Sequence, residues 1–390
     1  WFQGDAVRKN PNLKPETTIS KEIGAEVRLL DGRLTADVTY YDKYTRDQIV
    51  ESELSYLSNY QRVIINSGKI SNKGWEISVS GVPVKVKNFE WKTIFNWSKN
   101  NSMVESLPEG IDKIQIGSGV YNVKSYAEVG KPYGAIYAKT FKRDAEGYIL
   151  CQLDGSPKEG QDYEYLGCVQ ADWRGGWNNV FRLGNFSFSV MFDFQKGGKF
   201  FSQTSIQSSV DGQSVKSLEG RDADFFSRKI LGESDEERYG FMRPQNANTP
   251  TANGQIYPDW GRPKGVVLPN CRYDEDVEGL AGQQVLGYCT PERYWMHYTS
   301  RDISRFIYDA SYVKLREITV SYDLPKKWLR KTPFQTFRVA AVGRNIATLF
   351  ANTPHGLDPQ ATSTTGNAQG FERGFNLPSA TYGFDIKVSF

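Results

Sequence analysis

The chain has 390 residues, of which 39% are hydrophobic and 14% aromatic, and its formal net charge is +3. Its 48 lysines and arginines nearly cancel 45 aspartates and glutamates, so it lacks the basic excess of nucleic-acid-binding proteins, and we expect no nucleic-acid partner. No apolar run approaches the roughly 20 residues that a transmembrane helix needs, which excludes helical membrane spans. Two distant histidines argue against a histidine-rich metal site or a Ser/His/Asp triad, and we expect no enzyme.

The chain begins at Trp1 without an initiating methionine, a charged leader or an apolar leader segment. We therefore expect that a signal peptide was removed or that the chain is a piece of a longer one.

Apolar and polar residues alternate in nine segments, which is the pattern of strands with one buried or lipid-facing side. In the seventh segment Val313 and Leu315 are out of step with Ile318, which predicts a β-bulge. The nine predicted strands are residues 22–29, 33–40, 75–80, 89–98, 174–183, 186–195, 311–324, 335–349 and 381–390.

Short and long connections between these segments alternate. Asp31-Gly32 and Gly184-Asn185 are predicted two-residue turns, and residues 81–88 and 325–333 are also short. The predicted long loops are residues 51–70, 102–173, 197–310 and 350–378. Short turns at one end and long loops at the other are typical of an outer-membrane β-barrel.

A closed barrel explains why an aromatic-rich chain is polar on average. Lipid cannot hydrogen-bond the backbone, so spanning strands pair all round, with apolar side chains outward and polar side chains inward. The alternative is a large soluble β-sandwich or β-propeller, which also gives alternating strands. We expect the all-β transmembrane antiparallel barrel.

The four cysteines fall into two local pairs, Cys151 with Cys168 and Cys271 with Cys289. Their spacing is not that of a zinc site, and we predict two disulfides that close loops outside the cytosol. The alternative is four free thiols.

The long loops contain aromatic and charged residues that suit a sugar ring or a peptide side chain. The same residues could instead pack the loops together, and an acidic run at 274–278 is interpreted as solvated surface. The candidate ligand or lid contacts are Tyr257, Trp260, Tyr294, Trp295, Tyr298, Arg301, His355 and Arg373.

Several motifs, in order along the chain, resemble those of SusC/RagA-type TonB-dependent transporters. They are Asn10-Pro11-Asn12-Leu13-Lys14-Pro15-Glu16-Thr17, Tyr40-Tyr41-Asp42-Lys43, Asn72-Lys73-Gly74-Trp75-Glu76, Gly130-Lys131-Pro132-Tyr133-Gly134, Tyr312-Val313-Lys314-Leu315-Arg316, Gly356-Leu357-Asp358-Pro359 and the terminal Phe390.

The resemblance implies a barrel of 22 strands, of which residues 1–390 would be about the last nine, with the plug domain and signal peptide absent. It implies a location in the cell outer membrane and TonB-dependent import of a large oligosaccharide or peptide. The implied partners are a SusD-like surface lipoprotein as a lid, TonB through the missing plug, and outer-membrane lipid. A structural or adhesive barrel without active transport is the alternative.

Two further expectations follow from the resemblance. Phe390 is similar to the terminal signal that the outer-membrane assembly machinery reads. The loop between Gly130 and Gly176 resembles an acidic calcium loop, but its spacing departs from the usual pattern, and we consider solvated surface the better interpretation of Asp144 and Asp154 than calcium. We expect no other cofactor.

Overall fold

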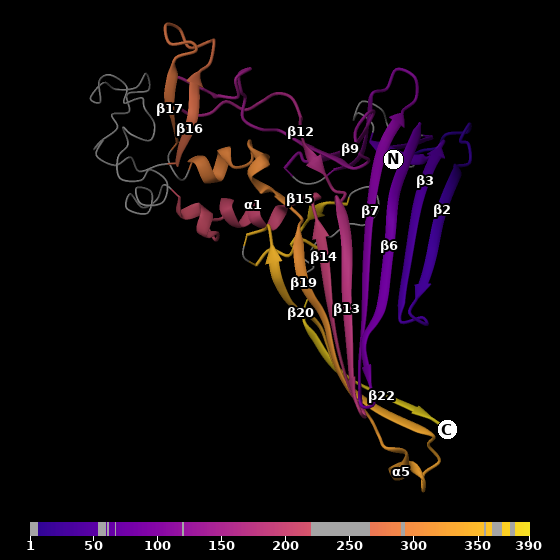
Figure 1. Ribbon diagram of the computed structural model, residues 1–390. Helices are drawn as coiled ribbons and strands as arrows, with labels where there is room; N and C mark the ends of the chain where they lie inside the picture. Colours follow the sequence, from indigo (N-terminus) through magenta and orange to yellow (C-terminus); the bar gives the residue numbers. More distant parts are fainter. Residues whose placement is uncertain are drawn as a thin grey trace, which may run out of the picture.

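The computed structural model describes residues 7–53, 60, 62–66, 68–118, 121–219, 266–289, 293–354, 356–360, 369–374 and 379–390. Nine antiparallel strands form one sheet in the order β2-β3-β6-β7-β13-β14-β19-β20-β22. Figure 1 shows this sheet as a wall along which the colours change in chain order, except where the large loops leave it. In the part of the chain that the structure describes, β2 and β22 are the two edges of the wall. The strands of the wall are β2 (Thr17–Leu29), β3 (Leu34–Arg46), β6 (Lys69–Val86), β7 (Phe89–Ser106), β13 (Trp173–Leu183), β14 (Phe186–Lys196), β19 (Tyr312–Asp323), β20 (Thr336–Ala351) and β22 (Thr381–Ser389).

Each of the nine predicted segments matches one strand of this wall to within one residue or lies inside it, so the predicted strands are confirmed. The prediction of a connection over residues 81–88 was wrong, because β6 continues to Val86 and turns directly into β7 at Phe89. The predicted tight turns are confirmed: Asp31 and Gly32 have positive φ angles of 55° and 80°, and Gly184 has a φ of 57°. Glycine reaches such angles without the clash that a Cβ atom causes.

The wall has two faces of opposite character. The outer face, defined by the apolar side chains of the alternation, exposes Ile23, Val27, Trp75, Phe95, Trp177, Phe188, Val320, Phe384 and Ile386. Two polar groups on this face are hydrogen-bonded by tryptophans, since Trp177 Nε1 donates to Thr93 Oγ1 (2.8 Å) and Trp91 Nε1 donates to Asn179 Oδ1 (3.0 Å). The other face, here called the inner face, has the polar residues of the alternation, Asp37, Glu76, Arg174 and Asp193 among them. This division is the one that lipid on one side and water on the other require.

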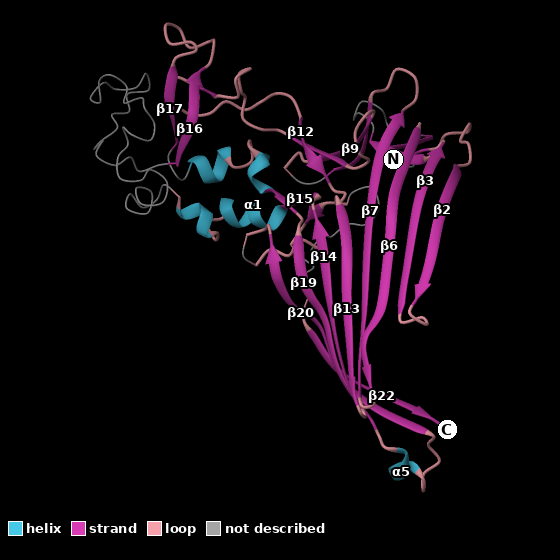
Figure 2. Ribbon diagram, viewed as in Figure 1, coloured by secondary structure: helices cyan, strands magenta, loops and turns pink. Residues whose placement is uncertain are grey.

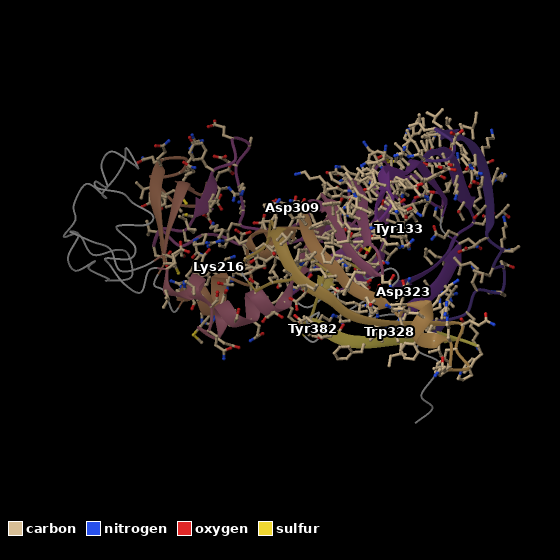
Figure 3. The ribbon with its side chains drawn as sticks, turned by 60° about the horizontal axis from the view of Figure 1, so that its bottom comes forward. Tyr133, Lys216, Asp309, Asp323, Trp328 and Tyr382 are labelled. Atoms are coloured by element: carbon tan, nitrogen blue, oxygen red, sulfur yellow. The ribbon has the colours of Figure 1, made fainter. Side chains whose placement is uncertain are left out.

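The long connections gather at one end of the wall, and the short turns lie at the other end (Figures 1 and 2). Asp323 and Trp328 lie at the short-turn end, near the small helix α5 (Lys326–Leu329) (Figure 3). None of the helices among the described residues is long and apolar enough to span a membrane.

The predicted long loops contain small sheets and helices. β8 (Lys113–Ser118), β9 (Lys124–Glu128), β10 (Ala135–Ala138) and β12 (Glu164–Cys168) form one sheet, here called the mouth sheet. A second sheet contains β11 (Ile149–Cys151), β16 (Val266–Tyr273) and β17 (Gln284–Cys289). The other strands are β1 (Val7–Arg8), β4 (Ile49–Glu53), β5 (Arg62–Asn66), β15 (Lys199–Ser202), β18 (Ile307–Asp309) and β21 (Phe371–Glu372). The helices of this end are α1 (Gln203–Val210), short 3₁₀ helices at Val215–Leu218 and Ile303–Phe306, and a π-helical turn at Tyr294–Tyr298.

The packed hydrophobic cores lie in this loop region rather than in the wall. One contains Phe141, Cys151, Trp295 and Tyr298, and a second contains Ile136, Phe201, Ile206 and Phe306. A third joins Ile114, Ile116 and Ala127 of the mouth sheet to Ile70 and Val104 at the top of the wall. The loop region is therefore a folded body anchored on the wall.

Candidate functional site

The inner face has a hollow of about 440 Å³ near the middle of the wall. Four strands contribute its charged residues: Asp37 from β3, Glu76 from β6, Arg174 from β13 and Asp193 from β14. Three carboxylates against one guanidinium make this hollow hydrophilic, which suits a water-filled passage better than an apolar binding pocket.

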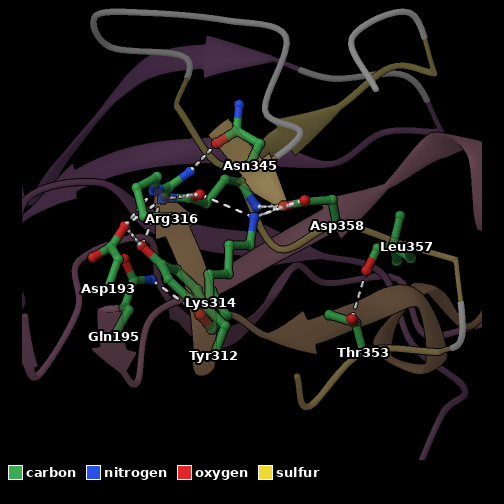
Figure 4. A network of polar contacts seen from close by, with 11 residues as sticks. Asp193, Gln195, Tyr312, Lys314, Arg316, Asn345, Thr353, Leu357 and Asp358 are labelled. Carbon is green, nitrogen blue, oxygen red and sulfur yellow. Dashed lines mark hydrogen bonds and ion pairs between the residues drawn. The ribbon is translucent and has the colours of Figure 1, made fainter. Parts of the chain in front are cut away.

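A charged network lies next to the hollow and centres on Arg316 (Figure 4). The guanidinium contacts Asp193 on the neighbouring strand, with Nε 3.2 Å from Oδ2, and Nη1 lies 2.7 Å from Oδ1 of Asn345. Its Nη2 also donates to Oε1 of Gln360 at 2.7 Å. Arg316 therefore links three strands of the wall and the loop that follows β20.

The predicted bulge explains why Arg316 points inward. In the pairing of β14 with β19, Met191 lies opposite Glu317 and Phe192 lies opposite Leu315, so Arg316 is the extra residue. A bulge turns one side chain out of the regular alternation. The slip in the sequence pattern was thus a signal of this residue, for which no role of its own was predicted.

The second cation of the network is the nearly buried Lys314. Its Nζ lies 2.6 Å from both carboxylate oxygens of Asp358 and 2.9 Å from Oε1 of Gln360. The Lys314 side chain is 6% exposed and that of Asp358 is 15% exposed. Tyr312 completes the network, since it donates to Asp193 (3.2 Å) and accepts from Gln360 Nε2 (2.6 Å). Together these contacts pin the loop at 356–360 onto the inner face.

Three of the predicted ligand contacts are core residues. Tyr294, Trp295 and Tyr298 are 1%, 1% and 2% exposed. Trp295 Nε1 donates to the carbonyl of Glu219 (3.1 Å), and Arg305 donates to the Tyr294 hydroxyl. Packing covers these rings in this structure, which favours the alternative that they hold the loop together. Their contact with a ligand stays a prediction.

The other predicted contacts have different positions. Arg301 is accessible, pairs with Glu159 (3.7 Å) and lies over the Tyr298 ring at 4.8 Å. Arg373 is half-buried beside β21. Tyr257, Trp260 and His355 lie outside the described residues. The structure brings Arg301 and Tyr298 together. The site around Arg316 instead contains Asp358 and Gln360 from the predicted loop at 350–378, and none of the predicted ligand contacts among the described residues.

The four cysteines are free thiols, and the predicted pairs are wrong. In the β16–β17 hairpin Cys271 lies opposite Val285 and Cys289 opposite Val266, so the two cysteines are offset by four residues. That offset is about 13 Å along a strand, whereas disulfides need Cα atoms within about 7 Å. Cys168 lies in the mouth sheet, where it contacts the carbonyl of Tyr133, away from the core around Cys151.

Cys151 instead lies beside Cys271. The strands β11 and β16 pair in parallel with Ile149 opposite Cys271, and the two thiols are hydrogen-bonded. This hydrogen bond, together with burial, raises the pKa of the Cys151 thiol well above its usual range.

The two aspartates of the predicted calcium loop bind arginines. Asp144 accepts from the backbone of Glu146 and Tyr148 (2.9 Å each) and pairs with Arg272 at 3.1 Å. Asp154 pairs with Arg293 at 3.0 Å. Across the residues that the structure describes, no three His, Cys, Asp or Glu side chains are grouped as metal ligands. Calcium binding therefore stays a prediction, and no group of metal ligands among the described residues supports it.

The interpretation of the acidic run as solvated surface was wrong for Asp274, which is 2% exposed. Its carboxylate accepts from Lys142 Nζ (2.9 Å) and Lys158 Nζ (2.8 Å). Burial acts to raise the pKa of Asp274, but the hydrogen bonds from the two lysines outweigh it and lower the pKa to about 2. Local sequence could not reveal these partners, which are more than a hundred residues away.

Phe390 follows the last strand at the short-turn end of the wall. Its side chain is 74% exposed, and its ring lies 5.2 Å from that of Phe334. The role of Phe390 as an assembly signal stays a prediction.

The comparisons with known proteins agree with this architecture. Residues 2–346 match the sequence model of the family described as "TonB dependent receptor-like, beta-barrel". The chain is 25% identical to "TonB-dependent receptor P3" of Formosa agariphila over 96% of its own length and 33% of that protein. It is 29% identical to "TonB-dependent receptor SusC" of Bacteroides thetaiotaomicron over 26% of its length and 10% of that protein.

The fold is also that of a solved transporter. The structure titled "Structure of the RagAB peptide importer in the 'closed-closed' state" superposes with a TM-score of 0.63 at 17% identity, over 98% of this chain and 36% of that chain. The chain thus spans about a third of the length of these first relatives.

Proposed function

Because the chain belongs to the TonB-dependent receptor-like β-barrel family, we propose that it is the C-terminal barrel portion of an active importer in the outer membrane. The cargo is a nutrient too large for simple diffusion pores, an oligosaccharide or a peptide. Energy comes from TonB through a plug domain.

One observation supports this proposal most strongly: the wall has an apolar outer face and a charged inner face with a hollow. Lipid solvates the first, and the second lines the route of a hydrated cargo. The loop latch, defined as Lys314, Arg316, Asp193, Asp358 and Gln360, holds the loop at 356–360 against this route. Because buried charges hold this loop, it has a defined position beside the passage. A passage that opens and closes requires such a defined closed position.

The proposed partner is a SusD-like surface lipoprotein that closes over the folded loop region. The similarity to SusC and to the RagAB peptide importer supports such a partner. The large folded body at the long-loop end of the wall is the surface that this lid would cover.

Deletion of the complete gene tests the proposal. We expect the deletion strain to lose growth on one class of oligosaccharide or peptide, and uptake of that nutrient in the complemented strain to stop when a protonophore collapses the inner-membrane proton gradient. Purification of the full-length protein from membranes should recover the lipoprotein. Uptake that persists without the gradient, or a deletion strain that loses only surface adhesion, would favour the alternative of a structural or adhesive barrel.

A further inference from the structure

One face of the mouth sheet is covered by tyrosines and lysines. Tyr126 of β9 lies opposite Gln115 and Ala135, and Tyr137 of β10 lies opposite Tyr165 of β12. Because side chains on neighbouring strands share a face when they lie opposite each other, these tyrosines form one surface. We call Tyr126, Tyr137, Tyr163 and Tyr165 with Lys113, Lys124 and Lys131 the tyrosine–lysine face.

The tyrosine–lysine face points away from the wall. Ile114, Ile116 and Ala127 have the opposite parity on the mouth sheet, and they pack against Ile70 and Val104 at the top of the wall. Ile70 and Val104 lie on the inner side of their strands, in step with Glu76 and Ser98. The tyrosine–lysine face therefore looks out over the inner side of the barrel mouth, where a cargo would enter.

Each lysine places its ammonium group over a tyrosine ring. Lys131 Nζ lies 4.5 Å from the ring centre of Tyr165, and Lys124 Nζ lies 4.5 Å from that of Tyr163. Lys113 Nζ lies 5.3 Å from the rings of both Tyr126 and Tyr137. These cation–π contacts hold the flexible lysine stems in place, so the positive charges are preorganised.

The positive charge of this face is not neutralised by its neighbours. Glu128 pairs with Lys131 (3.1 Å) and accepts from the Tyr137 hydroxyl. No carboxylate of the described residues forms a salt bridge with Lys113 or Lys124. Three lysines against one glutamate leave an excess of two positive charges. Tyr126 and Tyr137 are 9% and 4% exposed and support the face from below, whereas the Tyr165 side chain is 41% exposed and accessible.

The groups on this face select a ligand by its chemistry. Ammonium groups bind carboxylate or sulfate oxygens, and the exposed Tyr165 ring offers a surface for the C–H face of a sugar. A hydrophobic peptide side chain needs an aliphatic pocket. Among the described residues that pack with these tyrosines, Ala135 is the one aliphatic side chain, so the face offers no such pocket. We propose that the tyrosine–lysine face binds an anionic oligosaccharide, bearing carboxylate or sulfate groups, on its way into the barrel. The proposal rests on the importer function above and names its cargo class.

The test uses the full-length transporter purified together with its lipoprotein. Isothermal titration compares an oligogalacturonate, a sulfated galactan oligosaccharide, a neutral malto-oligosaccharide of equal length and a poly-glutamate peptide. The variant is Lys113→Gln/Lys124→Gln, which leaves the Lys131–Glu128–Tyr137 contacts intact and so avoids an unpaired half-buried carboxylate. The matched control is Lys326→Gln/Lys327→Gln, which removes two exposed charges at the opposite end of the wall.

We expect one of the two anionic oligosaccharides to bind, and the variant to weaken that binding about tenfold while the control does not. The same binding should weaken as salt rises, because exposed charges are screened. Equal affinity in the variant and the parent overturns the proposal. Lysine-dependent binding of poly-glutamate alone also overturns the proposal. Protection of Lys113 and Lys124 from amine labelling in the full-length protein overturns it too, because another part of the chain would then cover the face.

The binding assay requires neither TonB nor uptake. If neither anionic sugar binds but the gene deletion still abolishes energised uptake of a neutral sugar or a peptide, only this inference fails. If no energised uptake depends on the gene, the importer function itself fails.

Discussion

Removing the acid of the loop latch by Asp358→Asn should release the loop at 356–360 from the inner face. The change leaves Lys314 with a buried ammonium whose main counter-charge is gone, since the Lys314 side chain is 6% exposed. Removing one partner of a buried pair costs about 3–5 kcal/mol, because the remaining charge is neither solvated nor neutralised.

The geometry agrees with a cost of this size. At the observed separation of 2.6 Å, Coulomb attraction at an effective dielectric constant of about 20 is roughly 6 kcal/mol, part of which offsets desolvation of the two ions. The cost is local to the loop, so global unfolding of a barrel is the wrong measurement. Hydrogen exchange of the backbone amides at 356–360 in the full-length protein reports the opening directly, and an opening energy lower by 3 kcal/mol speeds exchange about 150-fold.

An exposed pair in the same wall is the control. Arg338 Nε also lies 2.6 Å from Asp323, but these side chains are 40% and 43% exposed. Asp323→Asn should change local exchange by less than about 1 kcal/mol, because water and salt already screen that pair. If Asp358→Asn and Asp323→Asn have equally small effects, burial does not strengthen the latch and the reasoning is refuted. The double variant Lys314→Met/Asp358→Leu should restore part of the protection, since it removes both charges.

Three other predictions follow from the faces and the loop body. Phe192→Lys on the outer face should lower the unfolding free energy of the full-length barrel by about 2–4 kcal/mol if this residue lies at the bilayer midplane. Met191→Lys on the inner face should cost far less. Equal costs would show that the faces are assigned wrongly. Oxidation of the protein with diamide should not join Cys271 to Cys289, because the two residues are offset by four positions in the β16–β17 hairpin; a non-reducing peptide map that finds this disulfide would contradict the strand register. The loop body should lose about 2 kcal/mol of stability as the pH falls from 4 to 2, because the pKa of Asp274 is about 2 in the folded state and near 3.8 in the unfolded state. Above that pH range the contribution of Asp274 to stability is complete. Asp274→Asn should therefore flatten the pH profile of stability measured by hydrogen exchange.

Because Asp193 lies on the polar inner face, alternation alone predicts that Asp193→Lys has only a mild effect on barrel stability. The structure indicates a larger effect. Asp193 accepts from Arg316 and from Tyr312, so Asp193→Lys would place a third cation beside Arg316 and Lys314. Alternation identifies the face of a residue, but it does not identify its partners.

The amino-acid sequence by itself determined the wall. A period of two residues depends only on the geometry of a strand, so the nine strands, their facing and the turns at Asp31-Gly32 and Gly184-Asn185 could be predicted locally. Even the bulge at Arg316 could be predicted, because an inserted residue shifts the phase of every apolar position after it.

Only the tertiary structure decided what the loops do. Tyr294 and Trp295 look like surface aromatics in an irregular stretch, yet packing against residues distant in sequence buries them. The contacts of Asp274 with Lys158 and of Lys314 with Asp358 span 116 and 44 residues. Cys151 likewise meets a thiol 120 positions away rather than the nearest one in sequence. Long loops have no fixed period, so the free energy of burying apolar surface and pairing charges, which depends on contacts between distant residues, decides their structure.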